Sequence, residues 1–237
     1  MKFDTPLIEG RLIKRYKRFL ADIALPDGDI ITAHCPNTGS MSGCDAPGST
    51  VWLSRSNNPD RKYPLTWEII KNEAGTLIGI NTSLSNRLVK EAIENELISE
   101  LSGYDKIRTE VRFGQENSRV DLLLESLTGQ PNCYVEVKNV TASTMNGIAV
   151  FPDAVSARGT KHLRELITVV ENGERAVLCY CVQRGDVEVV QPADQIDPLY
   201  GSTLRLAMVS GVEVIAYIAE INPEGITLKK NIPVFCP

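Results

Sequence analysis

The hydrophobic pattern of the chain changes once, near Asn81-Thr82-Ser83, and this change limits the possible folds more than any other feature. Before it, short apolar runs alternate with turn residues such as Pro26-Asp27-Gly28 and Asn57-Asn58-Pro59-Asp60, a pattern that predicts short β-strands. After it, apolar residues first recur at helical spacing, and strand-like runs follow. We therefore predict two domains, residues 1–80 and residues 81–237.

The first of these domains carries six short strand-like runs. They are Leu7–Ile13, Phe19–Leu25, Ile30–Cys35, Thr50–Ser54, Thr66–Lys71 and Thr76–Ile80. So many short strands in a small domain are typical of a closed barrel, because closure removes the exposed edges of the sheet. Among barrels that bind nucleic acids the OB-fold is the commonest choice, so we expect an OB-fold-like β-barrel.

The second domain begins with an amphipathic helix, which we expect to be capped by Thr82 or Ser83 and ended by Gly103. Two further helices are predicted at Ala157–Glu171 and Pro198–Ser210. The predicted strands are Lys106–Phe113, Arg119–Leu124, Cys133–Val140, Ala176–Val182, Val187–Val190 and Val212–Ile218. This order predicts an α/β fold class (α+β overall), with one mixed sheet flanked by helices.

Composition excludes several classes of protein. No apolar run approaches the roughly 18 to 20 residues that cross a bilayer, and the first ten residues lack the apolar core of a signal peptide. The 6 cysteines show no paired zinc spacing, and Cys35 with Cys44 near His34 would leave a four-ligand site incomplete. We therefore expect a cytoplasmic protein with no membrane partner, no zinc and no disulfide framework.

Charge is distributed unevenly along the chain. The formal net charge is −5, but residues 1–90 hold 12 basic and 9 acidic side chains, whereas residues 91–237 hold 13 and 21. A basic ribbon contains Arg11, Lys14, Arg15, Lys17 and Arg18, with Tyr16 inside it. Such cations neutralise phosphates and a tyrosine ring can stack on a base, although charges also protect an exposed strand edge. The ribbon is therefore a candidate nucleic-acid-binding segment.

The chemically most informative segments are Ser118–Leu124 and Tyr134–Lys138. Alternate side chains of a strand share a face, so Glu136 and Lys138 lie on one side and Asp121 can converge on them from a neighbouring strand. Two carboxylates suit Mg²⁺ or Mn²⁺, and a lysine beside them can position or deprotonate a water. The alternative is a Glu136–Lys138 ion pair at a strand edge, but charges on an interior strand favour the metal site.

An Asp followed by Glu-Val-Lys on adjacent strands resembles the PD-(D/E)XK nuclease superfamily, although Val120 stands where that motif has proline. The whole chain resembles the sugar fermentation stimulation protein A (SfsA) family. The matching segments are Gly10–Phe19, His34–Met41, Ser118–Asp121, Glu136–Thr141, Phe151–Ala154 and Arg158–Leu166. The resemblance implies an OB-type domain, a restriction-endonuclease-like domain, DNA binding and a proposed regulatory role in sugar (maltose) metabolism.

Further residues are candidates for the site. The resemblance favours Glu91 as an added acidic residue on the first helix, where a solvated helix face is the alternative. Lys161 is our candidate for phosphate contact or for positioning the lysine, with Arg158 second, and His162 is a weaker candidate for a general acid. Arg119 shares a strand face with Asp121, and we count Arg119 and Arg158 among the nucleic-acid-binding residues.

The leading hypothesis is a DNA-binding protein with a Mg²⁺- or Mn²⁺-dependent nuclease-like domain. The expected catalytic residues are Asp121, Glu136, Lys138, Lys161 and Glu91, and the expected metal ligands are Asp121 and Glu136. One rival is a non-catalytic DNA-binding regulator that keeps the nuclease fold as a scaffold, and another is a nuclease acting on RNA or an RNA–DNA hybrid. The donor-rich segment His34–Cys44 is either a phosphate-binding loop or a barrel turn.

Overall fold

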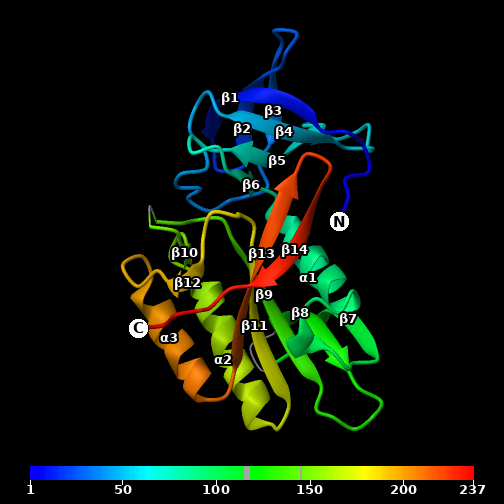
Figure 1. Cartoon of the computed structure of the whole chain (residues 1–237), viewed down its shortest axis with the longest axis vertical. Helices are drawn as coiled ribbons and strands as arrows, with labels where there is room; N and C mark the ends of the chain where they lie inside the picture. The colour runs from blue at the N-terminus through cyan, green and yellow to red at the C-terminus, as the bar shows by residue number, and fades with distance from the viewer. Residues whose placement is uncertain (115–117, 145) are drawn as a thin grey trace.

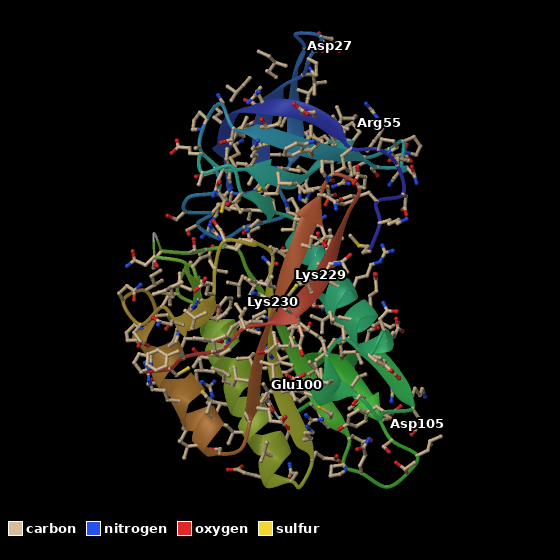
Figure 2. All side chains as sticks on the ribbon, viewed as in Figure 1. Asp27, Arg55, Glu100, Asp105, Lys229 and Lys230 are labelled. Carbon is tan, nitrogen blue, oxygen red and sulfur yellow. The ribbon has the colours of Figure 1, made fainter. Side chains whose placement is uncertain are left out.

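The computed structural model describes residues 1–114, 118–144 and 146–237. Its two parts follow one another along the long axis of the molecule, a small barrel above a larger sheet with helices on both faces (Figure 1). Figure 2 labels Asp27, in the turn after β2 at one end of the molecule, and Asp105, just before β7, toward the other end.

Six strands form the upper part. They are β1 (Ile8–Tyr16), β2 (Leu20–Ala24), β3 (Ile30–His34), β4 (Thr50–Arg55), β5 (Leu65–Lys71) and β6 (Leu77–Gly79). The sheet order is β3-β2-β1-β4-β5-β6, and a parallel pairing of His34 with Thr66 joins β3 to β5 and closes the barrel. Alternate residues such as Leu12, Leu53 and Trp67 fill its interior, as a period of two requires. The predicted OB-like barrel is confirmed.

The lower part is a mixed sheet covered on both faces. Its elements are α1 (Ser85–Glu94), β7 (Lys106–Phe113), β8 (Ser118–Glu125), β9 (Cys133–Val140), β10 (Ile148–Phe151), α2 (Ala157–Glu171), β11 (Arg175–Val182), β12 (Val189–Pro192), α3 (Pro198–Val209), β13 (Glu213–Asn222) and β14 (Gly225–Asn231). The sheet order is β14-β13-β11-β9-β8-β7, in which β9, β11 and β13 are parallel. Helix α1 covers one face, and α2 and α3 cover the other (Figure 1). The predicted fold class is confirmed.

For the first helix, the predicted capping residue and the predicted C-terminal end are both wrong. Asn81, rather than Thr82 or Ser83, accepts the capping hydrogen bond, from the Ser83 backbone, and a 3₁₀ turn over Thr82–Leu84 precedes α1. The helix stops at Glu94 instead of near Gly103. The apolar spacing continues because a second 3₁₀ turn, Ser99–Leu101, packs into the same core. Strands β10 and β14 were not predicted either.

Hydrogen bonds join the barrel to the lower part. The Gly79 N–H donates to the Gln183 carbonyl (2.9 Å), which links the end of β6 to the residue after β11. Asn37 Nδ2 donates to Thr141 Oγ1 (3.3 Å), and Thr82 Oγ1 donates to the Pro36 carbonyl (3.1 Å). Strand β9 therefore ends against the barrel. Among the described helices, none is both long and apolar enough to span a bilayer.

Candidate functional site

Asp121 lies where β8 separates from β9. The two strands pair only from Leu122 to Leu124, whereas β9 pairs with β11 along its whole length. Beyond that point Asp121 Oδ2 accepts a hydrogen bond from the Val137 backbone N–H (2.7 Å), in place of a carbonyl of the neighbouring strand. Asp121 Oδ1 accepts a second bond from Asn86 Nδ2 on α1 (2.8 Å). The local divergence of two strands thus fixes both oxygens of this carboxylate.

Glu136 is the second carboxylate, and its side chain is buried on β9. Its Oε1 accepts hydrogen bonds from Lys138 Nζ (2.7 Å) and from His162 Nδ1 on α2. Within the described residues its Oε2 is buried and has no hydrogen-bond partner. A buried polar atom without a partner costs free energy, so this oxygen marks a place where an interaction is missing.

The pKa values of the two carboxyl groups shift in opposite directions. Burial, followed by the negative charge of Glu136, raises the pKa of Asp121. Burial also acts to raise the pKa of Glu136, but the hydrogen bond from His162 and the charge of Lys138 outweigh it, so that this pKa lies below its usual value. Two neighbouring carboxyl groups with separated pKa values are typical of functional sites. A cation between them would favour the ionised form of both.

The chemistry of these donors fits a hard divalent cation. Among the described residues, Glu136 Oε2 accepts no hydrogen bond and each Asp121 oxygen accepts one, so that all of these atoms keep lone pairs for a cation. The atoms of this pair that could bind a metal are carboxylate oxygens, which suit Mg²⁺ or Mn²⁺. In the described ranges no three His, Cys, Asp or Glu side chains surround a common point, so water and substrate oxygens would complete the coordination. The expected ligands Asp121 and Glu136 therefore form a compatible pair.

The structure places Glu91 apart from this pair. Its Oε1 forms an ion pair with the amino group of Met1 (2.7 Å), beside β14. No hydrogen bond joins it to either carboxylate in the described part of the chain. The residue of α1 that reaches Asp121 is Asn86, which the sequence analysis missed because an asparagine at the start of a helix ordinarily indicates capping. The expected role of Glu91 in the site is therefore not supported by its position.

Helix α2 turns part of its polar stripe toward the sheet. His162 and Glu165 are buried, Lys161 is half-buried and Arg158 is exposed. His162 contacts Glu136 directly, and Arg158 Nε donates to His162 Nε2 (3.4 Å). The side chain of α2 that meets the carboxylate is thus His162, the residue after Lys161. Arg119 is exposed on β8, where it pairs with Arg112 of β7.

Most of the basic ribbon is engaged within the barrel. The Arg15 guanidinium donates to the carbonyls of Asn37 (3.0 Å) and Gly39 (2.8 Å), and so holds the 36–44 loop. Lys14 pairs with Asp22 (3.6 Å), which also accepts a hydrogen bond from Tyr16 (3.0 Å). Arg11 donates to the Gly48 carbonyl (3.3 Å). Arg11 and Lys14 nevertheless stay exposed, whereas Arg15 and Tyr16 are partly buried by these contacts.

Lys17 and Arg18 differ from the other cations of the ribbon. They form the turn between β1 and β2, with positive φ angles of 50° and 65°, and both are exposed. In the described part of the chain, no carboxylate lies within ion-pair distance of either residue. Arg18 also lines a cleft of about 360 Å³ between the barrel and the lower part. These two cations are therefore the part of the ribbon best placed to meet a phosphate.

Three segments meet at this cleft: residues 37–39 of the barrel, residues 139–142 at the end of β9, and residues 150–156 before α2. Asp153 packs directly over Gly39, where a Cβ atom would lie 2.1 Å from Asp153 Oδ2. Only glycine allows this approach. Asp153, which lies outside the Asp121–Glu136 pair, thus holds the barrel loop against the second domain.

Comparisons with known proteins cover both parts. Residues 83–225 match the family model described as the sugar fermentation stimulation protein RE domain, and residues 13–80 match the SfsA N-terminal OB domain. A sugar fermentation stimulation protein homolog of Thioalkalivibrio sulfidiphilus is 58% identical over 234 residues, covering 99% of this chain and 98% of that protein. Its counterpart in Pelobacter propionicus is 60% identical over 229 residues, covering 97% of each.

A solved structure also matches over nearly the whole chain. It is described as Pyrococcus furiosus SfsA in complex with Ca²⁺. The two structures superpose with a TM-score of 0.88 at 27% sequence identity, covering 99% of this chain and 98% of the other. The similarity therefore includes both the barrel and the mixed sheet.

Proposed function

The chain belongs to the sugar fermentation stimulation protein family, and from this membership we propose that it is a DNA-binding protein whose PD-(D/E)XK-like domain hydrolyses phosphodiester bonds with Mg²⁺ or Mn²⁺. The observation that carries the proposal is the buried Oε2 of Glu136 near Asp121, which has no hydrogen-bond partner among the described residues. The Pyrococcus furiosus relative was solved with Ca²⁺, another cation that takes oxygen ligands. That finding supports the choice of a hard cation.

The cation would be held by Asp121 and Glu136, where it would polarise the phosphodiester and lower the pKa of a bound water. The chain's own residues prepare this arrangement. Asn86 and the Val137 N–H orient Asp121, and His162 orients Glu136. Lys138 Nζ lies against Glu136 Oε1, where its charge offsets the negative charge that develops on the phosphate.

The polynucleotide would approach through the cleft between the two domains. Asn139, the residue after Lys138 on β9, lines this cleft, and Arg18 contributes an exposed cation on the barrel side. Exposed Arg119 and Arg158 would add phosphate contacts near the two carboxylates. Six free cysteines, five of them buried, are typical of a reducing compartment, which supports a cytoplasmic location.

A nuclease panel tests the proposal. Wild-type protein is incubated with single- and double-stranded DNA, RNA and an RNA–DNA hybrid, in Mg²⁺, Mn²⁺ or EDTA. We expect cleavage of DNA with either metal, none in EDTA, and none by Asp121→Asn. The matched control is Glu125→Gln, which removes a carboxylate of the same strand that pairs with Lys106 and Arg108 at the surface.

Each outcome of the panel selects one interpretation. Cleavage confined to RNA or to the hybrid would replace DNA as the substrate. Binding of DNA without cleavage of any substrate would support a non-catalytic regulator that uses the nuclease fold as a scaffold. Equal cleavage by Asp121→Asn and wild type would place the chemistry elsewhere.

A further inference from the structure

His162 lies buried between α2 and the sheet, where both of its ring nitrogens have partners. Nδ1 contacts Glu136 Oε1, and Nε2 accepts a hydrogen bond from Arg158 Nε (3.4 Å). Only 4% of the residue is exposed. Three side chains therefore form a continuous array that runs from the protein surface at Arg158 to the carboxylate of Glu136.

The groups at the two ends of this array both favour the same tautomer of the imidazole. Arginine is always charged and can only donate hydrogen bonds. His162 Nε2 must therefore be an acceptor, so that the ring proton resides on Nδ1 and is donated to Glu136 Oε1.

This array also determines which oxygen of Glu136 is available. Oε1 receives two donors, His162 Nδ1 and Lys138 Nζ, whereas Oε2 receives none among the described residues. A carboxylate held on one oxygen from two directions has a fixed orientation. Its second oxygen is then presented as a ligand without further rearrangement.

We propose that Arg158 and His162 are positioning residues that fix Glu136 with Oε2 directed into the metal site. This inference rests on the proposed metal-dependent function and adds residues that would tune cation affinity without touching the cation. Hydrogen-bonded partners that orient a ligand are known to affect metal affinity roughly 10- to 100-fold. The proposal thus predicts effects on binding at a distance from the cation.

The first test reads the imidazole directly and needs no metal. The chain has only 2 histidines, His34 and His162, so ¹⁵N spectra of the side chains contain two imidazole signals, and His34→Asn assigns them. We expect the neutral imidazole of His162 to carry its proton on Nδ1. In Arg158→Ala the proton should stay on Nδ1, because the Glu136 carboxylate can still only accept a hydrogen bond. A His162 ring with its proton on Nε2 in the wild type would overturn the proposal.

The second test measures Mn²⁺ binding by calorimetry together with thermal unfolding. We expect His162→Leu to weaken Mn²⁺ binding roughly 10- to 100-fold, because Glu136 loses its orienting donor. His162→Asn keeps an N–H donor near the position of Nδ1, so it should stay within about threefold of wild type. Arg158→Ala, at an exposed position, should weaken binding less than His162→Leu. Glu171→Gln, at the far end of α2, is the matched control and should leave binding unchanged.

The two tests separate this inference from the proposed function. A folded His162→Leu that binds Mn²⁺ as tightly as wild type would overturn the positioning role and leave the metal site intact. If His162→Leu does not fold, the other two variants decide. The positioning role would be overturned if His162→Asn bound Mn²⁺ at least tenfold more weakly than wild type while Arg158→Ala bound it normally. If neither wild type nor any variant binds Mn²⁺, the proposed function fails, and the role of His162 toward a cation fails with it.

Discussion

At the scale of single residues, Glu136 Oε1 concentrates the donors of the candidate site. Lys138 and His162 both donate to this atom, and the two partners come from a strand and a helix that pack together. Burial alone would hold the carboxyl group neutral, because desolvation disfavours its charged form. The two donors reverse that tendency and lower the pKa of Glu136. A buried carboxylate kept ionised in this way can bind a cation.

The first prediction concerns Lys138, whose side chain is only 12% exposed. We expect Lys138→Ala to abolish cleavage while leaving DNA affinity nearly unchanged, since a contact made chiefly in the transition state affects turnover more than binding. Mn²⁺ affinity should fall less than in His162→Leu, because the loss of a donor to Glu136 Oε1 is offset by the removal of a positive charge beside the cation site. His162 still donates to Glu136, so the loss of stability should be about 1–3 kcal/mol. Cleavage assays, calorimetry and thermal melts on one preparation measure all three effects.

Lys106→Ala provides the control, because it removes the lysine of an exposed pair with Glu125 (3.5 Å). It should change neither cleavage nor binding, since exposed ion pairs contribute little. If Lys138→Ala unfolds at a much lower temperature yet cuts at the wild-type rate, the lysine is only structural. Such a result would remove Lys138 from the catalytic assignment.

At the scale of elements, the hairpin β1–β2 divides its cations between two tasks. Arg15, within the strand, holds the 36–44 loop through backbone carbonyls, whereas Lys17 and Arg18 form the exposed turn. The loop in turn lies under Asp153, so that one side of the cleft depends on Arg15 for its shape. Arg15 thus supports one wall of the cleft, and Arg18, three residues later in the chain, lines the cleft.

The second prediction separates these two tasks. We expect the double variant Lys17→Gln/Arg18→Gln to weaken DNA binding for all sequences and to reduce the salt slope by up to about 1.8, equivalent to two phosphate contacts. The control is Lys229→Gln/Lys230→Gln, which removes the same charge from β14, where Figure 2 labels both residues. Arg15→Ala should instead lower thermal stability, because it removes the donors that hold the loop. An unchanged salt slope in the folded hairpin variant would exclude the turn from the interface.

Local sequence patterns predicted many helices and strands. Apolar residues recur about every two positions in a half-buried strand and every 3.6 in a helix, and both repeats can be read from the sequence alone. The same periodicity placed Asp121 and Glu136 on neighbouring strands, and the structure brings them together. Strand β14 escaped prediction because Lys229 and Lys230 interrupt its apolar alternation. His162 could not be assigned because its contact depends on how α2 packs against β9, which no local pattern encodes.

At the scale of the whole molecule, a buried polar network connects the barrel to the candidate site. Glu68 of β5 accepts hydrogen bonds from Ser54 (2.5 Å) and from Asn81 Nδ2 (2.8 Å) in the link between domains. The Asn81 carbonyl accepts from Gln183 Nε2 (3.2 Å), which also donates to Asn139 Oδ1 (2.6 Å), next to Lys138. Hydrogen bonds in a low-dielectric interior are stronger than in water, so this network favours one arrangement of the groups it joins, although Gln183 Oε1 has no partner among the described residues. The network therefore holds the end of β9 at a defined place relative to the barrel.

The last prediction uses Glu68, because burial raises its pKa despite its hydrogen bonds to Ser54 and Asn81. A raised pKa in the folded state means that the native protein binds this proton more tightly than the unfolded chain does. Its contribution to stability is therefore complete below the unfolded pKa, near 4.3, and is lost as the pH rises through the higher folded value.

Glu68→Gln removes this dependence on pH and keeps the network. The Ser54 hydroxyl can accept a hydrogen bond from the new amide N–H, while the amide oxygen accepts from Asn81. We expect the unfolding free energy of Glu68→Gln to match wild type near pH 4 and to exceed it increasingly up to pH 7, measured by urea unfolding. The exposed Glu73→Gln should show no such trend, and a constant difference between Glu68→Gln and wild type at every pH would contradict a proton held at this junction of the two domains.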